Sequence, residues 1–543
     1  MIVKGIRFLK EAGLFATFRE VKRKIRTTLQ NKIIAHTPLY TKEELENQRN
    51  VVFSRSIRFS ILVPLYNTPE RFLKEMIHSV MDQTYLNWEL CLADGSDAEH
   101  HHVESICNEY AKKDPRILYK KLEKNMGISE NTNVCIDMAT GEYLVLFDHD
   151  DLLHPAALFE VMKAICENNA DFIYTDENTF HKLPTDAFSP HFKPDYAPDT
   201  LRSYNYICHL TVFSRELLKK AGGKLNSEFD GSQDYDLILR LTEQAERIIH
   251  IPKILYYWRS HVNSVASDIS AKPYTVDAAK RALSQHLERC GLKGIVLDSK
   301  IPSTYRIAYE IDGSPLISIL IPNTDHVQEL KKCVNSIKEK STYQNWEIIV
   351  IENNSIEEET FTYYDVLKKD DRIGIVEWTG EFNAFKVNTF GAQYAKGEYI
   401  LFLNNHIEMI TPDWLEQMLM FAQRKDVGGV GAKVYYPDNT IQHAGVAVGK
   451  NGMRYYLHRG YPRKSNGYLF RLTIAQNIFC EETACFMMNK SVWNKIAGVI
   501  ETDKKAVQAA DICMQIGKRG YLVVWTPYAE MYQQHDKEKN YKY

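Results

Sequence analysis

The feature that most constrains the fold is a repeat, because the first and second halves of the chain carry the same succession of short motifs. Self-similarity at such a long spacing indicates that a whole domain has been duplicated. The sequence therefore predicts two homologous domains. The matching motifs are Ile-Leu-Val-Pro at 61–64 with Ile-Leu-Ile-Pro at 319–322, Asn-Trp-Glu at 87–89 with the same residues at 345–347, and Gly-Glu-Tyr at 141–143 with the same residues at 397–399.

Within each copy, short apolar runs alternate with segments of helical periodicity. In the first copy the runs 59–64 and 88–94 flank a helical pattern over 71–83, and a further helix is expected around 129–139. This alternation predicts a largely parallel, doubly wound α/β sheet of the Rossmann-like kind. The motifs of the second copy lie farther apart near its end, which predicts an insertion between about 430 and 480.

The length of 543 residues allows two large domains and a smaller segment. The sequence around 305–310 predicts one further strand between the two copies. The expected organisation is a basic amphipathic helical segment at 1–50, a first α/β domain at 55–290, a connector at 291–315 and a second, degenerate α/β domain at 316–543.

Composition narrows the class of protein. Hydrophobic residues make up 44% and charged residues 25%, which is ordinary for a globular chain, and the formal net charge of −3 argues against nucleic acid as a partner. Ten cysteines are scattered without metal-ligand spacing, and no signal peptide precedes them, so reduced thiols and a cytoplasmic location are expected. No apolar run reaches the roughly 18 residues of a membrane-spanning helix.

Residues 1–35 are strongly basic, and only Glu11 and Glu20 oppose that charge. An amphipathic basic helix can lie on an anionic membrane surface, which predicts peripheral contact with the inner face of the plasma membrane. The alternative is that the segment packs against the domain that follows it. The apolar residues at helical spacing are Leu14, Phe18, Val21, Ile25 and Leu29.

Three acids crowd the end of the apolar run 143–147 of the first copy: Asp148, Asp150 and Asp151. A buried strand would deliver them to its C-terminal edge, where open α/β sheets bind ligands. Such close carboxylates repel each other unless a cation neutralises them, and hard oxygen ligands suit Mg²⁺ or Mn²⁺ shared with substrate phosphates. The alternative is that the acids cap a helix beginning near residues 152–155.

The second copy serves as an internal control on these acids. Apolar runs, prolines and glycines occur in both copies, whereas the acids occur only in the first. Acids that shape the fold would be expected in both copies, so their selective loss favours a chemical role in the first. His406 and Glu408 leave metal binding by the second copy open. The aligned positions are Asp148 with Asn404, His149 with Asn405, Asp150 with His406, Asp234 with Ala509, and Asp236 with Asp511.

Other features of the first copy suit a nucleotide. Asp94 ends the run 88–94, where an acid can bond a base or a ribose. Asn125 and Gly127 open a turn before a helix, which offers backbone donors near the same edge. The glycine-rich phosphate fingerprints G-x-G-x-x-G and G-x-x-x-x-G-K-[ST] are absent, which argues against a conventional dinucleotide enzyme or P-loop NTPase.

Two later residues suit catalysis. Asp234 stands just before a predicted helix over 237–246 and can act as a general base on a hydroxyl, or can simply stabilise the helix dipole. His261 follows an aromatic pair and can complete a metal shell or touch a diphosphate, although a single histidine can equally be structural.

Taken together, these motifs resemble the family 2 glycosyltransferases with the GT-A fold. The resemblance covers residues 59–270 and 316–535, and it is closest to two-domain enzymes of bacterial surface polysaccharide and rhamnan synthesis. That family has Asp at the positions of His406 and Ala509, so the second domain is expected to be degenerate. The motifs are Leu-Val-Pro-Leu-Tyr-Asn at 62–67, Ala-Asp-Gly-Ser at 93–96, Asp-His-Asp-Asp at 148–151, Ser-Gln-Asp-Tyr-Asp at 232–236, and Trp-Thr-Pro-Tyr-Ala-Glu at 525–530.

The resemblance implies an inverting transfer of a sugar from a nucleotide-diphosphate donor, such as dTDP-rhamnose or a UDP-sugar, to a glycan or polyprenyl-linked acceptor. It implies Asp234 as the base that takes the acceptor proton. It implies Mn²⁺ or Mg²⁺ held by Asp150 with Asp148 or Asp151, with His261 as a further candidate ligand. The donor-binding residues are then Pro64, Tyr66, Asp94, Asn125, Gly127 and Asp148.

The segment 204–209 is rich in aromatic and hydrogen-bonding residues and is either an acceptor wall or core packing. The acceptor candidates are Tyr204, Asn205 and Trp258. The main hypothesis is a transferase active in the first domain only. The alternatives are a polysaccharide polymerase active in both domains, and a non-catalytic protein that binds nucleotide sugars or glycans.

Overall fold

The computed structural model describes residues 22–261, 273–448, 453–500 and 509–534. Residues 1–21, the first part of the predicted basic segment, lie outside the described residues. The chain divides into two compact units, which are Met1–Tyr196 with Tyr204–Tyr305 for the first, and Ala197–Ser203 with Arg306–Tyr543 for the second.

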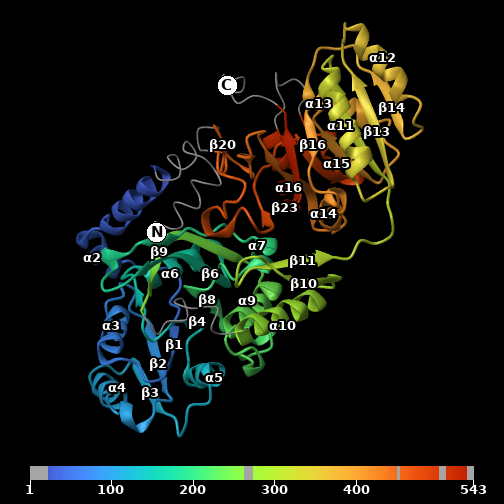
Figure 1. Ribbon diagram of the computed structural model, residues 1–543. Coiled ribbons are helices and arrows are strands. Elements are labelled where there is room, and N and C mark those ends of the chain that lie inside the picture. Colours follow the sequence, from blue (N-terminus) through green and yellow to red (C-terminus); the bar gives the residue numbers. More distant parts are fainter. Residues whose placement is uncertain (1–21, 262–272, 449–452, 501–508, 535–543) are drawn as a thin grey trace, which may run out of the picture. The chain divides into compact units, whose positions relative to one another are not determined.

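The first unit is built on a nine-stranded mixed sheet with the strand order β3-β2-β1-β4-β8-β6-β9-β5, and β7 pairs with β6 (Figure 1). The pairs β1–β2, β2–β3 and β1–β4 are parallel, as predicted, whereas β8 is antiparallel to both of its neighbours. The strands are β1 (Phe59–Leu65), β2 (Trp88–Asp94), β3 (Ile117–Lys121), β4 (Tyr143–Leu146), β5 (Leu152–Leu153), β6 (Phe172–Phe180), β7 (Ser189–His191), β8 (Thr211–Ser214) and β9 (Ile248–Arg259).

Helices cover both faces of this sheet. In Figure 1, α3 and α4 lie on one side of β1 and β2, and α5 lies on the other. Because both faces are covered, β1 and β2 are buried along nearly their whole length, which explains their continuous apolar sequences. The helices are α2 (Lys42–Arg49), α3 (Glu70–Met81), α4 (His102–Lys113), α5 (Ile128–Met138), α6 (Ala157–Asn168), α8 (Arg215–Lys220), α9 (Gln233–Gln244) and α10 (Pro273–Arg289), with a further helix over residues 22–36.

The second unit repeats the plan of the first. Its ten-stranded sheet has the corresponding order β14-β13-β12-β15-β22-β17-β23-β16, with β18 and β21 attached to β17 and β23. The predicted insertion supplies β18 to β21. The strands are β12 (Ile317–Asn323), β13 (Trp346–Glu352), β14 (Ile373–Glu377), β15 (Tyr399–Leu403), β16 (Ile407–Met409), β17 (Val427–Tyr435), β18 (Ile441–His443), β19 (Val446–Val448), β20 (Arg454–Tyr456), β21 (Gln476–Asn477), β22 (Cys485–Asn489) and β23 (Leu522–Gln533).

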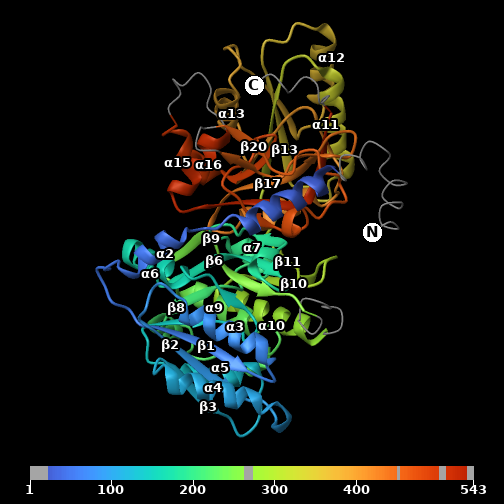
Figure 2. The same ribbon diagram turned by 90° about the vertical axis from the view of Figure 1, so that its left-hand side faces the viewer.

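The helices of the second unit include α7, which comes from the middle of the first half of the chain. Figures 1 and 2 both show α11 and α12 beside β13. Two short strands, β10 (Gly294–Asp298) and β11 (Tyr305–Tyr309), lie between the copies, and β11 is the predicted connector strand. The helices are α7 (Pro198–Ser203), α11 (Val327–Lys340), α12 (Glu358–Leu367), α13 (Ala384–Ala392), α14 (Trp414–Ala422), α15 (Lys490–Ala497) and α16 (Ala509–Lys518).

The repeated motifs of the first unit form one hydrogen-bond network at the N-terminal ends of β1, β2 and β4. The Ser60 hydroxyl donates to Glu89 Oε1 at 2.6 Å and accepts from the Gly141 backbone N–H at 2.8 Å. A Cβ at Gly141 would lie 2.5 Å from the backbone oxygen of Arg58, so only glycine fits there. This contact explains why Asn-Trp-Glu and Gly-Glu-Tyr recur together.

The second unit has the same hydrogen-bond network. The Ser318 hydroxyl donates to Glu347 Oε1 at 2.7 Å and accepts from the Gly397 backbone N–H at 2.8 Å. A Cβ at Gly397 would lie 2.5 Å from the backbone oxygen of Leu316. The predicted duplication is therefore visible as a shared hydrogen-bond network as well as a shared strand order.

Helix α7 belongs to the second unit, a grouping that linear domain boundaries do not anticipate. Asp199 on α7 is buried and pairs with Arg424, and it accepts a hydrogen bond from Asn477 Nδ2 at 2.7 Å. Arg202 lies 3.3 Å from the same carboxylate. Burial opposes the charge of Asp199, but Arg424 and Arg202 hold its pKa down at about 2.

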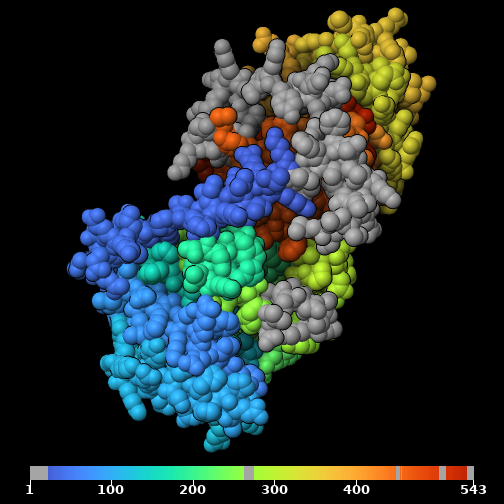
Figure 3. Space-filling view, turned by 60° about the vertical axis from the view of Figure 1, so that its left-hand side comes forward, coloured from blue at the N-terminus to red at the C-terminus, as the bar shows by residue number. Residues whose placement is uncertain are grey.

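The helix over residues 22–36 keeps an apolar stripe exposed. Ile25, Leu29 and Ile33 are 57%, 56% and 65% exposed, and Figure 3 shows this blue helix at the surface. Asn31 Nδ2 donates to the backbone oxygen of Phe188 at 2.7 Å, so one side of the helix contacts the first unit. Among the described residues, no helix is both long enough and apolar enough to cross a membrane.

Candidate active site of the first unit

Asp94 ends β2 at the C-terminal edge of the sheet and is fully buried. Its carboxylate accepts hydrogen bonds from the Ser96 backbone N–H at 2.8 Å, the Tyr119 hydroxyl at 2.8 Å and Lys121 Nζ at 3.0 Å. Burial disfavours the charged form, but the hydrogen bonds from Ser96, Lys121 and Tyr119 lower the pKa of Asp94 below its ordinary value. The result is a fixed, ionised acceptor facing this edge.

The predicted turn after β3 lies against the same corner. Asn125 Oδ1 accepts from the Gly127 backbone N–H at 3.1 Å and from Asn131 Nδ2 at 2.9 Å. A Cβ at Gly95 would lie 3.1 Å from the Cα of Asn125, so a glycine after Asp94 lets the two loops approach. Gly127 has φ of 94° and starts α5, whose N-terminus points its backbone donors at this edge.

The end of β1 supplies the neighbouring surface. Pro64 and Leu65 pair in register with Ala93 and Asp94, so the two strand ends are side by side. Tyr66, the next residue, is 47% exposed, so an aromatic side chain at the surface follows the end of β1 directly. The structure thus brings Pro64, Tyr66 and Asp94 together.

Asp150 and His261 form the next part of the site. His261 Nε2 lies 2.8 Å from Asp150 Oδ2, although 111 residues separate them in the chain. An imidazole nitrogen and a carboxylate oxygen aimed at each other are a suitable pair of ligands for a divalent cation.

Asp148 lies close to other acids. Burial raises the pKa of Asp148 above its ordinary value, and the charges of Asp150 and Asp234 add to the rise against an opposing contribution from His209. A bound cation would relieve that repulsion. The Asp150–His261 pair and the neighbouring carboxylate of Asp148 are donor types that suit Mn²⁺ or Mg²⁺.

Asp151 differs from the other two acids, with which the sequence grouped it as a metal ligand. It is fully buried, its Oδ2 accepts from the Tyr256 hydroxyl at 2.6 Å, and its Oδ1 accepts from the Arg259 backbone N–H at 2.6 Å. Burial and the charges of Asp150 and Asp148 raise the pKa of Asp151 well above its ordinary value. Asp151 therefore ties the acid loop to β9.

The capping alternative for these acids is wrong. Leu152 and Leu153 form β5, not a helix, and α6 begins only at Ala157. Its N-cap residue is Ala156, and no side chain caps the helix. Asp148, Asp150 and Asp151 therefore do not cap α6.

Arg259 stabilises the backbone of the loop that carries Asp150. Its Nε donates to the backbone oxygen of Asp150 at 2.5 Å, and its guanidinium lies 2.8 Å from Glu75 Oε2. The guanidinium carbon sits 4.4 Å from the ring centre of Phe72 and 4.6 Å from that of Phe180. This fully buried cation fixes the loop without occupying the acid side chains.

Asp234 lies in the first turn of α9, which starts four residues before the predicted helix. Asn205 Nδ2 donates to Asp234 Oδ2 at 2.9 Å, and the Cys208 thiol donates to the same oxygen at 3.4 Å. No hydrogen bond from the described residues reaches Oδ1. One carboxylate oxygen is therefore held while the other is available as a base.

His209 is a site residue that the sequence placed only in a general acceptor wall. Its ring stacks on Tyr256 with centres 4.6 Å apart, and its Nε2 lies 3.8 Å from Asp148 Oδ2. Asp148, Asp151 and His209 have possible ligand atoms within 4.8 Å of one another. The position of His209 depends on a loop that returns from β7 to β8, so no local motif could reveal it.

The other acceptor candidates differ in exposure. Tyr204 is buried and its ring stacks on His191 with centres 6.4 Å apart, which is core packing. Asn205 faces Asp234, and Trp258 is half-buried with its ring centre 6.0 Å from that of His209. Asn205 and Trp258 thus flank the acids, and Tyr204 supports them.

At the corresponding edge of the second unit, the polar residues at the strand ends bond to neighbouring side chains. Glu352, at the position of Asp94, accepts from the Ser355 hydroxyl at 2.7 Å and the Tyr364 hydroxyl at 2.5 Å. Asn405 Nδ2 donates to Asn323 Oδ1 at 2.7 Å.

The acid positions of the second unit are also altered. His406 packs edge-on against His326 with ring centres 5.7 Å apart, and Glu408 pairs with Lys340 at 3.3 Å. Asp148, Asp150 and Asp234 thus have no acidic counterpart in the second unit, where Asn404, His406 and Ala509 are the aligned residues.

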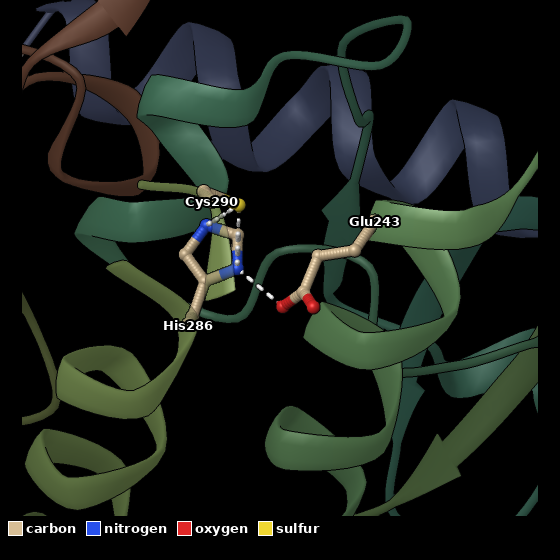
Figure 4. A group of neighbouring side chains, drawn as sticks. All are labelled: Glu243, His286 and Cys290. Atoms are coloured by element: carbon tan, nitrogen blue, oxygen red, sulfur yellow. Dashed lines mark hydrogen bonds and ion pairs between the residues drawn. The ribbon is translucent and has the colours of Figure 1, made fainter. Parts of the chain in front are cut away.

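A second group of potential ligands lies on α9 and α10. Figure 4 shows Glu243, His286 and Cys290 facing one another, with His286 Nδ1 2.6 Å from Glu243 Oε1. Arg289 bonds both oxygens of Glu243, at 2.6 and 2.7 Å. Glu243 is therefore already paired with His286 and Arg289 and links the two helices, while Cys290 is exposed beside them.

The family model for glycosyl transferase family 2 matches residues 60–222 and 318–496, which is more than half of the chain and one match per unit. The chain belongs to glycosyl transferase family 2. The GT-A-like fold expected from the sequence is confirmed in both units.

The chain spans about half or less of the length of two relatives that it matches. Protein y4gI of Sinorhizobium fredii is 40% identical over 87% of this chain and 52% of its own length. The O-antigen biosynthesis protein RfbC of Myxococcus xanthus is 33% identical over 87% of this chain and 37% of its own length. The solved structure of S. aureus TarS in complex with UDP-GlcNAc is 18% identical, covering 42% of this chain and 66% of that one, with a TM-score of 0.36.

Proposed function

We propose that the first unit catalyses an inverting transfer of a sugar from a nucleotide-diphosphate donor to a glycan or lipid-linked glycan in the synthesis of a cell-surface polysaccharide. The observation that carries the proposal is the convergence of Asp94, Asp150 with His261, and Asp234 at one edge of the sheet. The O-antigen role in the name of the relative RfbC supports the choice of acceptor class. The donor is a UDP-sugar or dTDP-rhamnose.

The donor lies along the strand ends from β2 to β4. Asp94 accepts hydrogen bonds from the nucleoside, and Tyr66 covers the base. The N-terminus of α5 at Gly127 points its donors toward the phosphates. Asp148, Asp150 and His261 would hold Mn²⁺ or Mg²⁺, and such a cation would supply positive charge close to the diphosphate of the donor.

The acceptor approaches from the side of α9. Asp234 Oδ1 takes the proton of the acceptor hydroxyl while the hydroxyl oxygen attacks the anomeric carbon and the bond to the nucleoside diphosphate breaks. Attack from the face opposite to the leaving group inverts the configuration. Asn205 holds the base, and Trp258 packs against the sugar.

Thermal stability in the presence of UDP, dTDP and GDP, with and without Mn²⁺, tests this proposal. A ligand that binds only the folded state raises Tm by mass action. We expect one nucleotide to raise Tm with Mn²⁺, and we expect Asp150→Ala and His261→Ala to lose the increase. His406→Ala, at the position aligned with Asp150, is the matched control and keeps it. An increase that survives Asp150→Ala would refute the donor site.

The second unit acts as a non-catalytic scaffold or glycan platform in this proposal. It has Asn404, His406 and Ala509 at the positions aligned with Asp148, Asp150 and Asp234. A variant with His406→Ala and Glu408→Ala should keep every linkage that the wild type makes. Loss of one linkage type would instead support a polymerase with two active units.

The helix over residues 22–36 brings the enzyme to the inner face of the membrane in this proposal. Its exposed stripe of Ile25, Leu29 and Ile33 lies among basic residues, and residues 22–36 contain no acid. Co-sedimentation with vesicles rich in phosphatidylglycerol should fall strongly in a variant with Ile25→Ser and Leu29→Ser. Equal sedimentation with uncharged vesicles, or no loss in the variant, would argue for packing against protein instead.

A further inference from the structure

We propose that Lys193 is a positioning residue for catalysis: it pins the segment 204–210, and this segment in turn orients the base Asp234. The inference rests on the proposed function, because it gives a role to the surroundings of the base. Lys193 lies 41 residues before Asp234 in the chain and does not touch it.

Lys193 is anchored to the sheet at both of its ends. Its side chain has no exposed surface. Its backbone N–H donates to Asp176 Oδ1 at 2.8 Å, and its Nζ lies 3.1 Å from Glu177 Oε2. Both acids are on β6, so the lysine is held against a central strand of the first unit.

The same ammonium group holds two backbone carbonyls of the segment 204–210. Nζ donates to the Ile207 oxygen at 2.6 Å and to the His209 oxygen. An ammonium group has three donors, and Glu177, Ile207 and His209 account for all three. Removing the lysine would leave two buried carbonyls and one buried carboxylate without this donor, a costly arrangement in a protein interior.

The pinned segment delivers three side chains to the acids. Asn205 and Cys208 both donate to Oδ2 of Asp234, at 2.9 and 3.4 Å. The next residue, His209, stacks on Tyr256 and faces Asp148. Because both donors hold the same oxygen, they fix the rotation of the carboxylate and turn Oδ1 toward the incoming hydroxyl.

The competing explanation is that Lys193 only neutralises Glu177. Burial opposes the charge of Glu177, but Lys193 and a hydrogen bond from His191 lower its pKa to about 2. The two explanations differ in what happens when both charges are removed. Neutralisation is no longer needed in a Lys193→Met/Glu177→Gln variant, whereas the two carbonyls remain unpinned.

The first test compares that double variant with wild type in nucleotide release from UDP- and dTDP-sugars. We expect Lys193→Met alone to lower both Tm and kcat. We expect the double variant to regain only part of the lost Tm, because the two carbonyls still lack their donor, and to keep a kcat at least tenfold below wild type with KM for the donor within twofold. Recovery of kcat together with Tm would overturn the proposal. The matched control is Lys220→Met/Glu246→Gln, which removes an exposed pair and should leave kcat unchanged.

A second test asks whether the segment acts through Asp234. Asn205→Ala and Cys208→Ala should each lower kcat in the wild type, by about tenfold for Asn205. In an Asp234→Ala background, neither substitution should lower the residual rate further. Full additivity in that background would mean that Asn205 and Cys208 act on something other than the base.

A third measurement does not depend on turnover. Hydrogen–deuterium exchange of the peptide covering 204–210 should become faster in the Lys193→Met/Glu177→Gln variant and should not change in the Lys220→Met/Glu246→Gln control. Unchanged exchange would show that Lys193 does not hold the segment 204–210 in place. Wild-type turnover in Asp234→Ala would refute the proposed base instead, and the exchange result would still decide whether Lys193 holds the segment.

Discussion

At the scale of residues, the two units differ in the acids near the C-terminal ends of their strands. They share the apolar residues that pack the sheet. Asp94 and Glu352 occupy the same register at the end of equivalent strands. Asp94→Asn should weaken nucleotide binding by roughly tenfold or more, since a hydrogen bond to a charged group contributes about 1.5–3 kcal/mol. Glu352→Gln should leave binding unchanged. Isothermal titration with the nucleotide from the stability screen measures both, and equal losses would place the donor elsewhere.

Two neighbouring acids on α9 provide a sharper comparison. Asp234 faces Asn205, whereas Asp236 pairs with Arg240 at 2.8 Å and recurs as Asp511 in the second copy. Asp234→Asn should lower kcat by about 10² to 10⁴ because general base catalysis is worth that much. Asp236→Asn should lower Tm but keep kcat within a few-fold. The opposite result in steady-state kinetics would exchange the two roles.

At the scale of elements, the repeated glycines act through close backbone contacts. Gly141→Ala would set a Cβ 2.5 Å from the Arg58 oxygen, and such overpacking costs about 1–3 kcal/mol. Gly498→Ala is the control, because nothing lies within 4 Å of its Cβ position and its φ is −74°. Urea unfolding should show a lower midpoint for Gly141→Ala only. Equal midpoints would show that the backbone around Gly141 and Arg58 can relax to accept a Cβ.

The ion pair between Asp199 on α7 and Arg424 predicts how the stability of the second unit changes at acidic pH. Asp199 has a pKa of about 2 in the folded protein and 3.8 as its ordinary value, so its ionised form stabilises the fold. That stabilisation is fully present above about pH 4 and is lost as pH falls toward 2. Asp199→Asn should destabilise the second unit at pH 7 and remove part of the steep loss of stability between pH 4 and 2. Hydrogen exchange in β17 against pH checks this, and parallel curves for variant and wild type would contradict it.

At the scale of the whole molecule, the second unit is assembled from two distant parts of the chain. Residues 306–543 alone lack α7, so Arg424 loses the carboxylate of Asp199. Breaking a buried ion pair in this way costs about 3–5 kcal/mol. The fragment should therefore be less stable than a fusion that supplies residues 197–203 on a long flexible linker. Asp199→Ala in the fusion is the control, and equal stability of fragment and fusion would show that α7 is dispensable.

The sequence by itself determined the features that depend on neighbours in the chain. The apolar runs of the β1 and β2 strands, the alternation with helices and the duplication follow from local pattern, because burial on both faces of a sheet requires continuous apolar residues. Comparison of the copies then singled out Asp148, Asp150 and Asp234, since the fold retains what it needs in both.

Only the tertiary structure decided what depends on contacts between distant residues. Asp151 is tied down by Tyr256 and Arg259, more than 100 residues away, so spacing could not separate it from Asp150. Lys193 carries no motif, and its role arises because a buried ammonium group must find three acceptors wherever the fold provides them. Local pattern specifies which segments form the sheet, whereas desolvation of buried polar groups specifies which side chains meet around it.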